Sequence, residues 1–321
     1  MQESCCQGFL NLNKIGGMTS HDCVATLRRW LGIKKIGHGG TLDPMAEGVL
    51  PLAIGRATRL LPYLPIDKTY EAVVRFGLTT TTDDLEGVPI TQVAAGHLTL
   101  TTLEAILPEF LGVIDQVPPR FSAIQVQGQR LYDLARRGQV VIPPPRSVTI
   151  HHLQVRDWQS GDYPELTLTV DCGPGTYIRS LARDLGQKVG TGATLVSLRR
   201  TRSGGFSLQN SLTLEAVESR LETQTLILTP IATALDDLPA ITLEPPLAQA
   251  WRQGQKINSP LPLLLGQPHR VLAAESGELL GIGQNEDRQG RVILKAKMVL
   301  EPWSATQVPY AAGFAEGLGE V

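Results

Sequence analysis

The chain is short of cysteines and of long apolar runs, and each shortage excludes a class of protein. Its four cysteines form neither a CxxC pair nor an evenly spaced set, which argues against structural zinc and a disulfide scaffold. No stretch approaches the about 18 consecutive apolar residues that a membrane-spanning helix needs. The first residues lack a basic start followed by an apolar core, so no signal peptide is expected. We therefore predict a reduced, cytoplasmic protein with no membrane partner.

Motifs for metals and nucleotides are missing as well. The histidines lack the spacing of metal ligands, and the adjacent His151 and His152 would point to opposite faces of a strand. No segment matches the GxxxxGK[ST] phosphate-binding loop, so nucleotide hydrolysis is not expected. The sequence therefore predicts no metal site and no nucleotide cofactor.

Basic residues are clustered although the net charge is −2. Residues 28–35 hold four bases and no acid, residues 120–146 hold five arginines against one aspartate, and residues 179–202 hold six bases against one aspartate. Such clusters are sufficient to bind phosphates. A single cluster is more often a solvated helix face, but three of them favour a polyanionic partner.

Apolar alternation and turn residues predict an α+β fold with a mixed, largely antiparallel sheet, because helices and strands lack regular βαβ spacing. The predicted strands are 9–15, 48–55, 68–77, 147–157, 165–172 and 193–204, and the predicted helices are 21–31, 103–112, 130–138 and one after Gly175. Ser20 is the expected N-cap of the first helix and Gly32 its end. Thr101 and Glu104 are the expected capping box of the second helix.

The last quarter of the chain has a different texture. After about residue 236, short apolar segments separated by the turns ESGE and EDRQG predict strands of a small β-rich domain. Residues 304–321 are rich in Gly and Ala with little pattern, and we expect a flexible tail.

The most informative segment is GHGGTLDPMAEGVLPLAIGRATR, residues 37–59. It begins like a glycine-rich phosphate loop, but Asp43 lies where such a loop would carry Lys and Ser or Thr. By itself, an Asp-Pro pair is usually a turn, and a lone histidine such as His38 is usually a surface residue. The loop therefore needs support from other segments before it indicates chemistry.

That support comes from KTY at 68–70 and GTYIRSLARDLG at 175–186. Together with the loop they closely resemble the bacterial tRNA pseudouridine-55 synthases, the TruB family, over residues 9–235. The segments GLTTTTDDLEG, VPPRFSAIQVQGQRLYDLARRG and ATLVSLRRTRSG share the resemblance. It implies a pseudouridine synthase fold in residues 1–235, a PUA-like RNA-binding domain in 236–303 and a tail in 304–321. The PUA-like match is looser and depends on RVLAAESGELLGIGQ.

The resemblance implies an isomerase that converts uridine 55 in the T-loop of tRNA to pseudouridine. The N1–C1′ bond breaks, the base rotates, and C5 bonds to C1′. No group is lost, so no cofactor or metal is required. A monomer is expected, with the arginines of 120–146 and 179–202 binding phosphates of the T-arm.

Residue by residue, the resemblance makes Asp43 the catalytic carboxylate, acting either as a nucleophile at the sugar or as a base that removes a sugar proton. Arg179 is expected to hold it ionised. The implied substrate-binding residues are His38, Lys68, Tyr70, Tyr177, Arg179 and Leu198. The sequence departs from the family pattern at Gly39, Thr81 and Arg120, and Thr81 puts the order of its loop in question.

Two other functions fit parts of the pattern. An RNA chaperone would bind tRNA without modifying it, but it would need no loop carboxylate. A nucleoside hydrolase would release free uracil and would need a second acid, for which Glu47 and Asp84 are the candidates.

Overall fold

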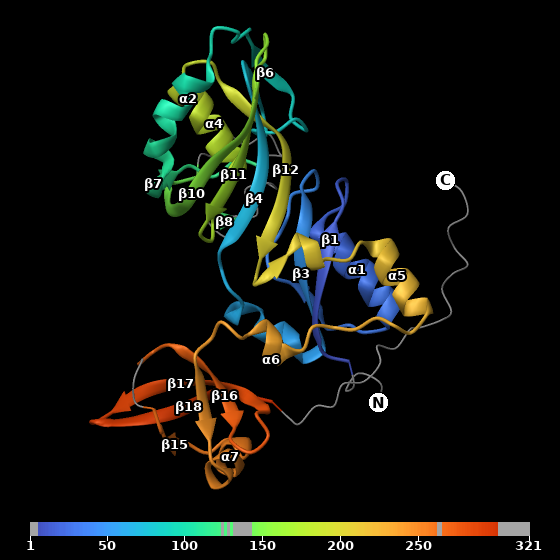
Figure 1. The fold of residues 1–321 in the computed structure, drawn as a ribbon, viewed down its shortest axis with the longest axis vertical. Helices are drawn as coiled ribbons and strands as arrows, with labels where there is room; N and C mark the ends of the chain where they lie inside the picture. Colours follow the sequence, from blue (N-terminus) through green and yellow to red (C-terminus); the bar gives the residue numbers. More distant parts are fainter. Residues whose placement is uncertain (1–5, 123–124, 127–128, 131–142, 262–264, 301–321) are drawn as a thin grey trace.

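The computed structural model describes residues 6–122, 125–126, 129–130, 143–261 and 265–300. Half of the described strands form one nine-stranded sheet (Figure 1). Its central order is β1 (Gly8–Lys14), β3 (Glu47–Ile54), β12 (Ala193–Ser203), β4 (Lys68–Phe76), β11 (Glu165–Cys172), β10 (Arg146–Gln159) and β7 (Gly112–Gln116), with β2 (Ile36–His38) on β3 and β13 (Phe206–Ser207) on β12. β12 and β3 run parallel and the other neighbours antiparallel. The expected mixed, largely antiparallel sheet is confirmed.

Helices cover this sheet at both ends. α1 (Ser20–Leu31) and α5 (Leu214–Glu222) lie beside β1, and α2 (Leu100–Ile106) and α4 (Ile178–Lys188) lie at the β10 and β7 end (Figure 1). β4 alternates buried and less buried positions, with Tyr70, Ala72, Val74 and Phe76 facing inward, whereas β3 is buried along nearly its whole length. Each large apolar side chain buried in this way stabilises the fold by about 1.5–3 kcal/mol.

The start of each of two helices differs from the prediction. Thr19, not Ser20, is the N-cap of α1, and it forms a capping box with Asp22. Thr99, not Thr101, caps α2 by accepting a hydrogen bond from the Thr102 amide. In both cases a threonine slightly earlier in the chain has the extended backbone that a cap requires. Gly32 ends α1 as expected, with a φ of 65°.

Smaller elements connect these parts. They are η2 (Gly55–Tyr63), β5 (Leu78–Thr80), β6 (Pro89–Gln92), η3 (Leu107–Phe110), β8 (Gln125–Val126), β9 (Gln129–Arg130), η4 (Leu208–Asn210) and α6 (Ile231–Ala234). Apart from Arg130, the helix predicted at 130–138 lies outside the described residues, and so does the tail from 304.

A second sheet of five strands follows residue 239 (Figure 1). Its order is β14 (Ala240–Leu243), β16 (Pro268–Ala273), β17 (Leu279–Arg288), β18 (Arg291–Val299) and β15 (Ile257–Asn258). The segment predicted as strands only also contains the helix α7 (Pro245–Arg252). Its Trp251 is fully buried and donates a hydrogen bond from Nε1 to the Leu280 carbonyl. Pro at the first helical turn is what favours the helix here.

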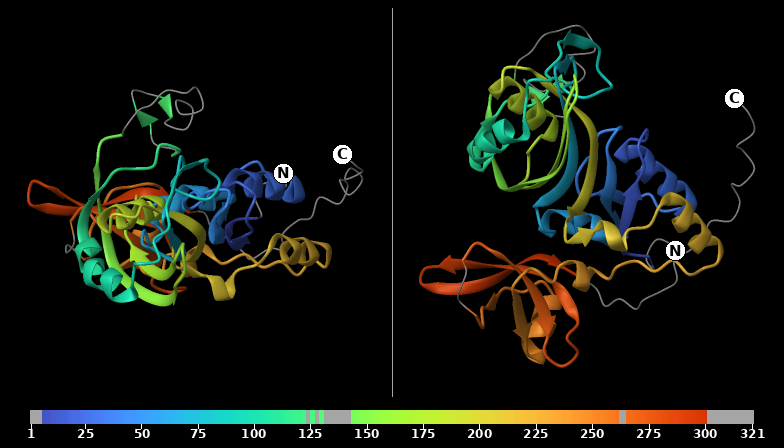
Figure 2. Two further views of the ribbon diagram at one scale, coloured as in Figure 1. Left: turned by 90° about the horizontal axis from the view of Figure 1, so that it is seen from above. Right: turned by 45° about the horizontal axis from the view of Figure 1, so that its top comes forward.

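The two sheets are joined by an apolar cluster. Phe9 of β1, Leu60 of η2 and Leu64 just after η2 belong to the same buried cluster as Ile282 and Met298 from the small sheet. The small sheet is thus packed against the η2 side of the molecule, as the right view of Figure 2 shows. In the described part of the chain, no helix has the length and apolarity to cross a membrane.

Candidate active site

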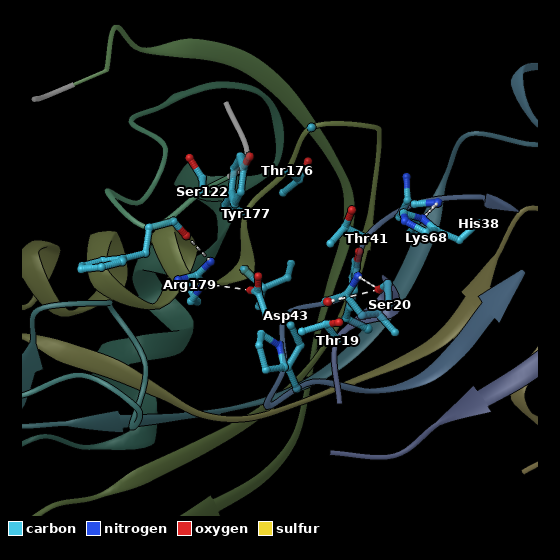
Figure 3. A pocket seen from close by; sticks show the side chains of 18 of the residues that line it. Thr19, Ser20, His38, Thr41, Asp43, Lys68, Ser122, Thr176, Tyr177 and Arg179 are labelled. Carbon is cyan, nitrogen blue, oxygen red and sulfur yellow. Dashed lines mark hydrogen bonds and ion pairs between the residues drawn. The ribbon is translucent and has the colours of Figure 1, made fainter. Parts of the chain in front are cut away.

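A cavity of about 900 Å³ opens where the glycine-rich loop, the start of α1, β4, α4 and β12 meet (Figure 3). This is large enough for a ligand of nucleotide size. Its lining includes all seven residues that the sequence analysis selected: His38, Asp43, Lys68, Tyr70, Tyr177, Arg179 and Leu198. These residues come from positions up to 160 apart in the chain, so the fold is what brings them together.

The loop that carries Asp43 is held by side chains from other elements. Ser20 Oγ accepts from the Leu42 amide at 2.9 Å, and Lys14 Nζ donates to the Pro44 carbonyl at 3.0 Å. Lys14 is fully buried and also donates to the Ile15 and Met18 carbonyls. Because the loop forms no ladder of its own, these side chains satisfy its backbone groups and fix its path.

Arg179 lies between two carboxylates. Its Nε is 3.0 Å from Asp43 Oδ2, an ion pair without hydrogen-bond geometry, and its Nη1 is 3.3 Å from Asp84 Oδ2. The guanidinium also donates to the Thr82 and Phe121 carbonyls, at 3.1 and 2.9 Å. The side chains of Arg179 and Asp84 are 5% and 3% exposed, whereas that of Asp43 is 33% exposed toward the cavity. Asp43 is thus the acid that a ligand can reach.

The pKa of Asp43 is raised above the ordinary aspartate value. Removal of the carboxylate from water is the largest cause, the charge of Arg179 opposes it, and Asp84 adds to the rise. We expected Arg179 to keep Asp43 ionised, and it does lower the pKa, but burial outweighs it. Arg179 therefore limits the rise in pKa and orients the carboxylate.

The opposite wall of the cavity carries His38 and Lys68, which lie side by side in Figure 3. Burial lowers the pKa of both, and the nearby charge of Arg200 lowers each further, so His38 is neutral at neutral pH. Burial raises the pKa of Tyr70, which keeps its phenol protonated. Tyr70 and Leu198, 7% and 8% exposed, form the apolar part of this wall.

Tyr177 is placed by a residue that the sequence analysis did not select. It is the N-cap of α4, and its backbone N–H and carbonyl both bond the side-chain amide of Gln116, at 2.8 and 2.9 Å. Gln116 is 1% exposed at the end of β7. Ser122 lies next to the Tyr177 ring at the top of the cavity (Figure 3).

The positions that depart from the family pattern fit the local structure. The Thr81 hydroxyl accepts a hydrogen bond from the Val88 amide, which holds the loop together at this position. A Cβ at Gly39 would be 3.4 Å from Pro51 Cβ, a tight but tolerable contact. Gly40 has a φ of +135°, so the glycine is required there. Arg120 is exposed.

The basic cluster at 179–202 differs from the expected phosphate-binding surface. Arg179 and Arg200 are 4% and 1% exposed, and Arg183 is paired with Asp83 and Asp184. The expectation that this cluster as a whole binds phosphate is therefore wrong, because its inward members serve the protein interior. Most of the cluster at 120–146 lies outside the described residues.

Three known protein-family domains match consecutive parts of this chain. Residues 28–178 match the TruB family pseudouridylate synthase N-terminal domain, residues 179–237 the tRNA pseudouridylate synthase B C-terminal domain, and residues 239–296 the TruB C-terminal region of pseudouridine synthase II. The tRNA pseudouridine synthase B of a Nostoc species is 52% identical over 298 residues, which cover 93% of this chain and all of that protein.

The chain belongs to the TruB family.

It is therefore a pseudouridine synthase, an isomerase. The enzyme named tRNA pseudouridine synthase B in a Synechocystis species is 50% identical over 91% of this chain and 99% of its own. Among solved structures, a Cbf5-Nop10-Gar1 complex aligns with a TM-score of 0.70 at 25% identity, over 94% of this chain and 87% of that one. An H/ACA ribonucleoprotein bound to a substrate RNA aligns with a TM-score of 0.69 at 23% identity, over 93% and 87% of the two chains. These neighbours confirm the pseudouridine synthase fold.

Proposed function

We propose that this member of the TruB family isomerises uridine 55 in the T-loop of tRNA to pseudouridine. The N1–C1′ bond breaks, the detached uracil rotates, and its C5 bonds to C1′ as the C5 hydrogen leaves. The observation that carries the proposal is the composition of the cavity wall, in which Asp43 is the only acid among the described lining residues. One carboxylate suits an isomerisation that must exclude water, whereas hydrolysis of a glycosidic bond uses a second one.

Asp43 is the catalytic residue in this account. Breaking the N1–C1′ bond develops positive charge on the sugar, and a carboxylate can stabilise that charge, bond to the sugar or remove a sugar proton. Arg179 orients Asp43 and is itself fixed by Asp84. The neutral His38 and the amine of Lys68 line the opposite wall, where they can contact the base or its phosphate.

The target base must leave its stack to reach this cavity. Such unstacking costs a few kcal/mol, which stacking on an aromatic ring can offset by about 1–3 kcal/mol per base. Tyr70 and Tyr177 supply the rings and Leu198 supplies an apolar contact in the same wall. The phenol of Tyr70 remains protonated, so it can also donate a hydrogen bond to the base.

The tRNA backbone is proposed to cross an outward basic surface formed by Arg29, Lys34, Lys35 and Arg59. All four are exposed and form no ion pair within the described part of the chain. The Gly55 amide donates to the Lys35 carbonyl at 2.8 Å, which brings the start of η2 to the entry of β2. β2 then runs directly to His38 in the cavity, about 10 Å beyond Lys35 at the usual strand rise.

The protein is further proposed to act as a cytoplasmic monomer. Its catalytic domain would span residues 1–235, the PUA-like RNA-binding domain 236–303 and the tail 304–321. The shared cluster of Phe9, Leu60, Ile282 and Met298 supports a fixed orientation of the two domains, because separating them would expose this apolar surface.

The residues of the site argue against the two rival functions, a nucleoside hydrolase and an RNA chaperone. Glu47 and Asp84, the candidates for a second acid, do not line the cavity: Glu47 pairs with Arg199, and Asp84 is buried against Arg179. A hydrolase therefore lacks its second carboxylate among the described residues. A pure chaperone would not require a carboxylate and an arginine at the bottom of the cavity.

The test is product analysis on unmodified tRNA transcripts. Wild-type protein should yield one pseudouridine per transcript, found at position 55, and none when position 55 is changed to cytidine. Release of free uracil would establish a hydrolase instead. Tight binding without any product would establish a chaperone.

A further inference from the structure

Arg200 on β12 is a buried cation without a carboxylate partner among the described residues. It is 1% exposed, and each of its three side-chain nitrogens donates to a backbone carbonyl: Nε to Val49 at 2.7 Å, Nη2 to Gly40 at 3.0 Å and Nη1 to Thr41 at 3.3 Å. Burying a charge that has no counter-charge is unfavourable, and an apolar residue of similar size would fill the same space without that cost. Such a residue calls for a functional explanation.

The carbonyls that Arg200 binds flank the loop of Asp43 on both sides. Gly40 and Thr41 come just before Asp43, and Val49 lies in β3 just after the loop. One rigid guanidinium therefore joins the entry of this loop to its exit, which a single amine could not do in the same geometry.

The backbone around Arg200 is built for this close approach. β12 lies parallel to β3 with Arg200 opposite Gly48, whose φ is +100°. A Cβ at Gly48 would be only 2.2 Å from the Arg200 carbonyl oxygen, so only glycine fits there.

Arg200 also lies beside Tyr70, in the cavity wall proposed to hold the base. It is the direct cross-strand partner of Tyr70 between β12 and β4. Burial raises the pKa of Tyr70, and the adjacent Arg200 guanidinium opposes that rise. Gly40 lies between the side chains of Arg200 and Lys68. A Cβ at this position would be 3.7 Å from Arg200 Nη1 and 3.5 Å from Lys68 Cε.

We propose that Arg200 is a positioning residue that fixes the distance between the Asp43 carboxylate and the Tyr70 ring, and hence between the carboxylate and the sugar of the bound uridine. Arg200 does not line the cavity, so it acts through these two residues rather than on the substrate. The inference depends on the proposed function, because it assigns Arg200 a part in that reaction.

The test uses full-length Arg200→Lys and Arg200→Gln with a tRNA transcript labelled with tritium at C5 of uridine. A misplacement of about 1 Å in an active site costs about 100-fold in rate. Both variants should therefore lose about 30- to 100-fold in single-turnover rate at saturating tRNA, while the Kd for tRNA changes less than about threefold. Arg75→Gln, which removes a partly exposed arginine of β4 paired with Glu165, is the matched control and should retain the wild-type rate.

The two arginine variants also separate position from charge. Burial is the largest cause of the lowered pKa of His38, and the charge of Arg200 is the second. Arg200→Gln should therefore raise that pKa, whereas Arg200→Lys should not. NMR titration of the imidazole would measure the difference. Rates within about threefold of wild type, or a rate loss that saturating tRNA restores, would overturn the proposal. So would failure of both variants to fold, which would make Arg200 merely structural. If wild-type protein releases no tritium, the proposed function itself fails.

Discussion

Two groups of basic residues look alike in the sequence but face opposite ways in the fold. Arg179, Arg183 and Arg200 lie on α4 and β12, and they are buried or paired with carboxylates and carbonyls. Arg29 of α1, Lys34 and Lys35 just before β2, and Arg59 of η2 are exposed. The inward group organises the site, and the outward group is available to RNA. Counting cations along a sequence therefore does not measure a nucleic-acid surface.

Removing the central inward arginine should have the largest effect. Arg179→Gln leaves Asp43 without its cation and Asp84 buried without an ion-pair partner. We expect a loss of at least about 10³-fold in single-turnover rate and of about 3–5 kcal/mol in stability. Quench-flow kinetics and urea unfolding would measure the two losses. A variant as stable as wild type would show that Asp84 does not depend on Arg179.

Neutralising the outward group should instead weaken binding. The fourfold variant Arg29→Gln, Lys34→Gln, Lys35→Gln and Arg59→Gln should raise the Kd for tRNA by about 10- to 100-fold and keep the rate at saturation. The slope of log Kd against log salt should fall by about 0.7–0.9 for each phosphate that the variant no longer neutralises.

Arg220→Gln is the control for this variant, because Arg220 is exposed on α5 among Glu215, Glu218 and Glu222 and should not meet RNA. An unchanged Kd for the fourfold variant would place the RNA elsewhere on the protein.

The pH dependence of the rate reports on the inward group. If the reaction needs ionised Asp43, activity is lost as the pH falls through its pKa, and that pKa is raised by burial. The acid limb of the single-turnover rate should therefore lie above the ordinary aspartate value of 3.8. Because Arg179 opposes the rise, Arg179→Gln should move this limb to still higher pH. A limb at or below the ordinary value would contradict the assignment.

The smallest effect is expected from substitution of Arg199, the residue next to Arg200. Arg199 alternates to the outer face of β12, where its side chain is 53% exposed and pairs with Glu47 at 3.2 Å. Exposed pairs of this kind contribute about 0–1 kcal/mol, so Arg199→Gln should change the unfolding free energy by less than about 1 kcal/mol. A larger loss would show that the two faces of β12 are less distinct than their burial implies.

The sequence was sufficient to select seven of the residues that line the cavity because each lies in a motif that resembles the TruB family. It did not select Asp84 as the partner of Arg179, or Gln116 as the partner of Tyr177. Those contacts join residues about 60 to 100 positions apart and leave no periodic signal. It also assigned Arg179 and Arg200 to a phosphate surface, because burial of an arginine depends on which strands flank it. The helix caps differed by one or two residues because neighbouring threonines and serines are equally good caps by composition.

The role of Asp43 is tested most directly by single-turnover tritium release from tRNA labelled at C5 of uridine, comparing wild type with Asp43→Asn. The substitution keeps the shape of the side chain and removes its charge. We expect release by the wild type, no detectable release by the variant, and a Kd for tRNA within about threefold. Release by Asp43→Asn at a rate near that of wild type would contradict the role assigned to this carboxylate.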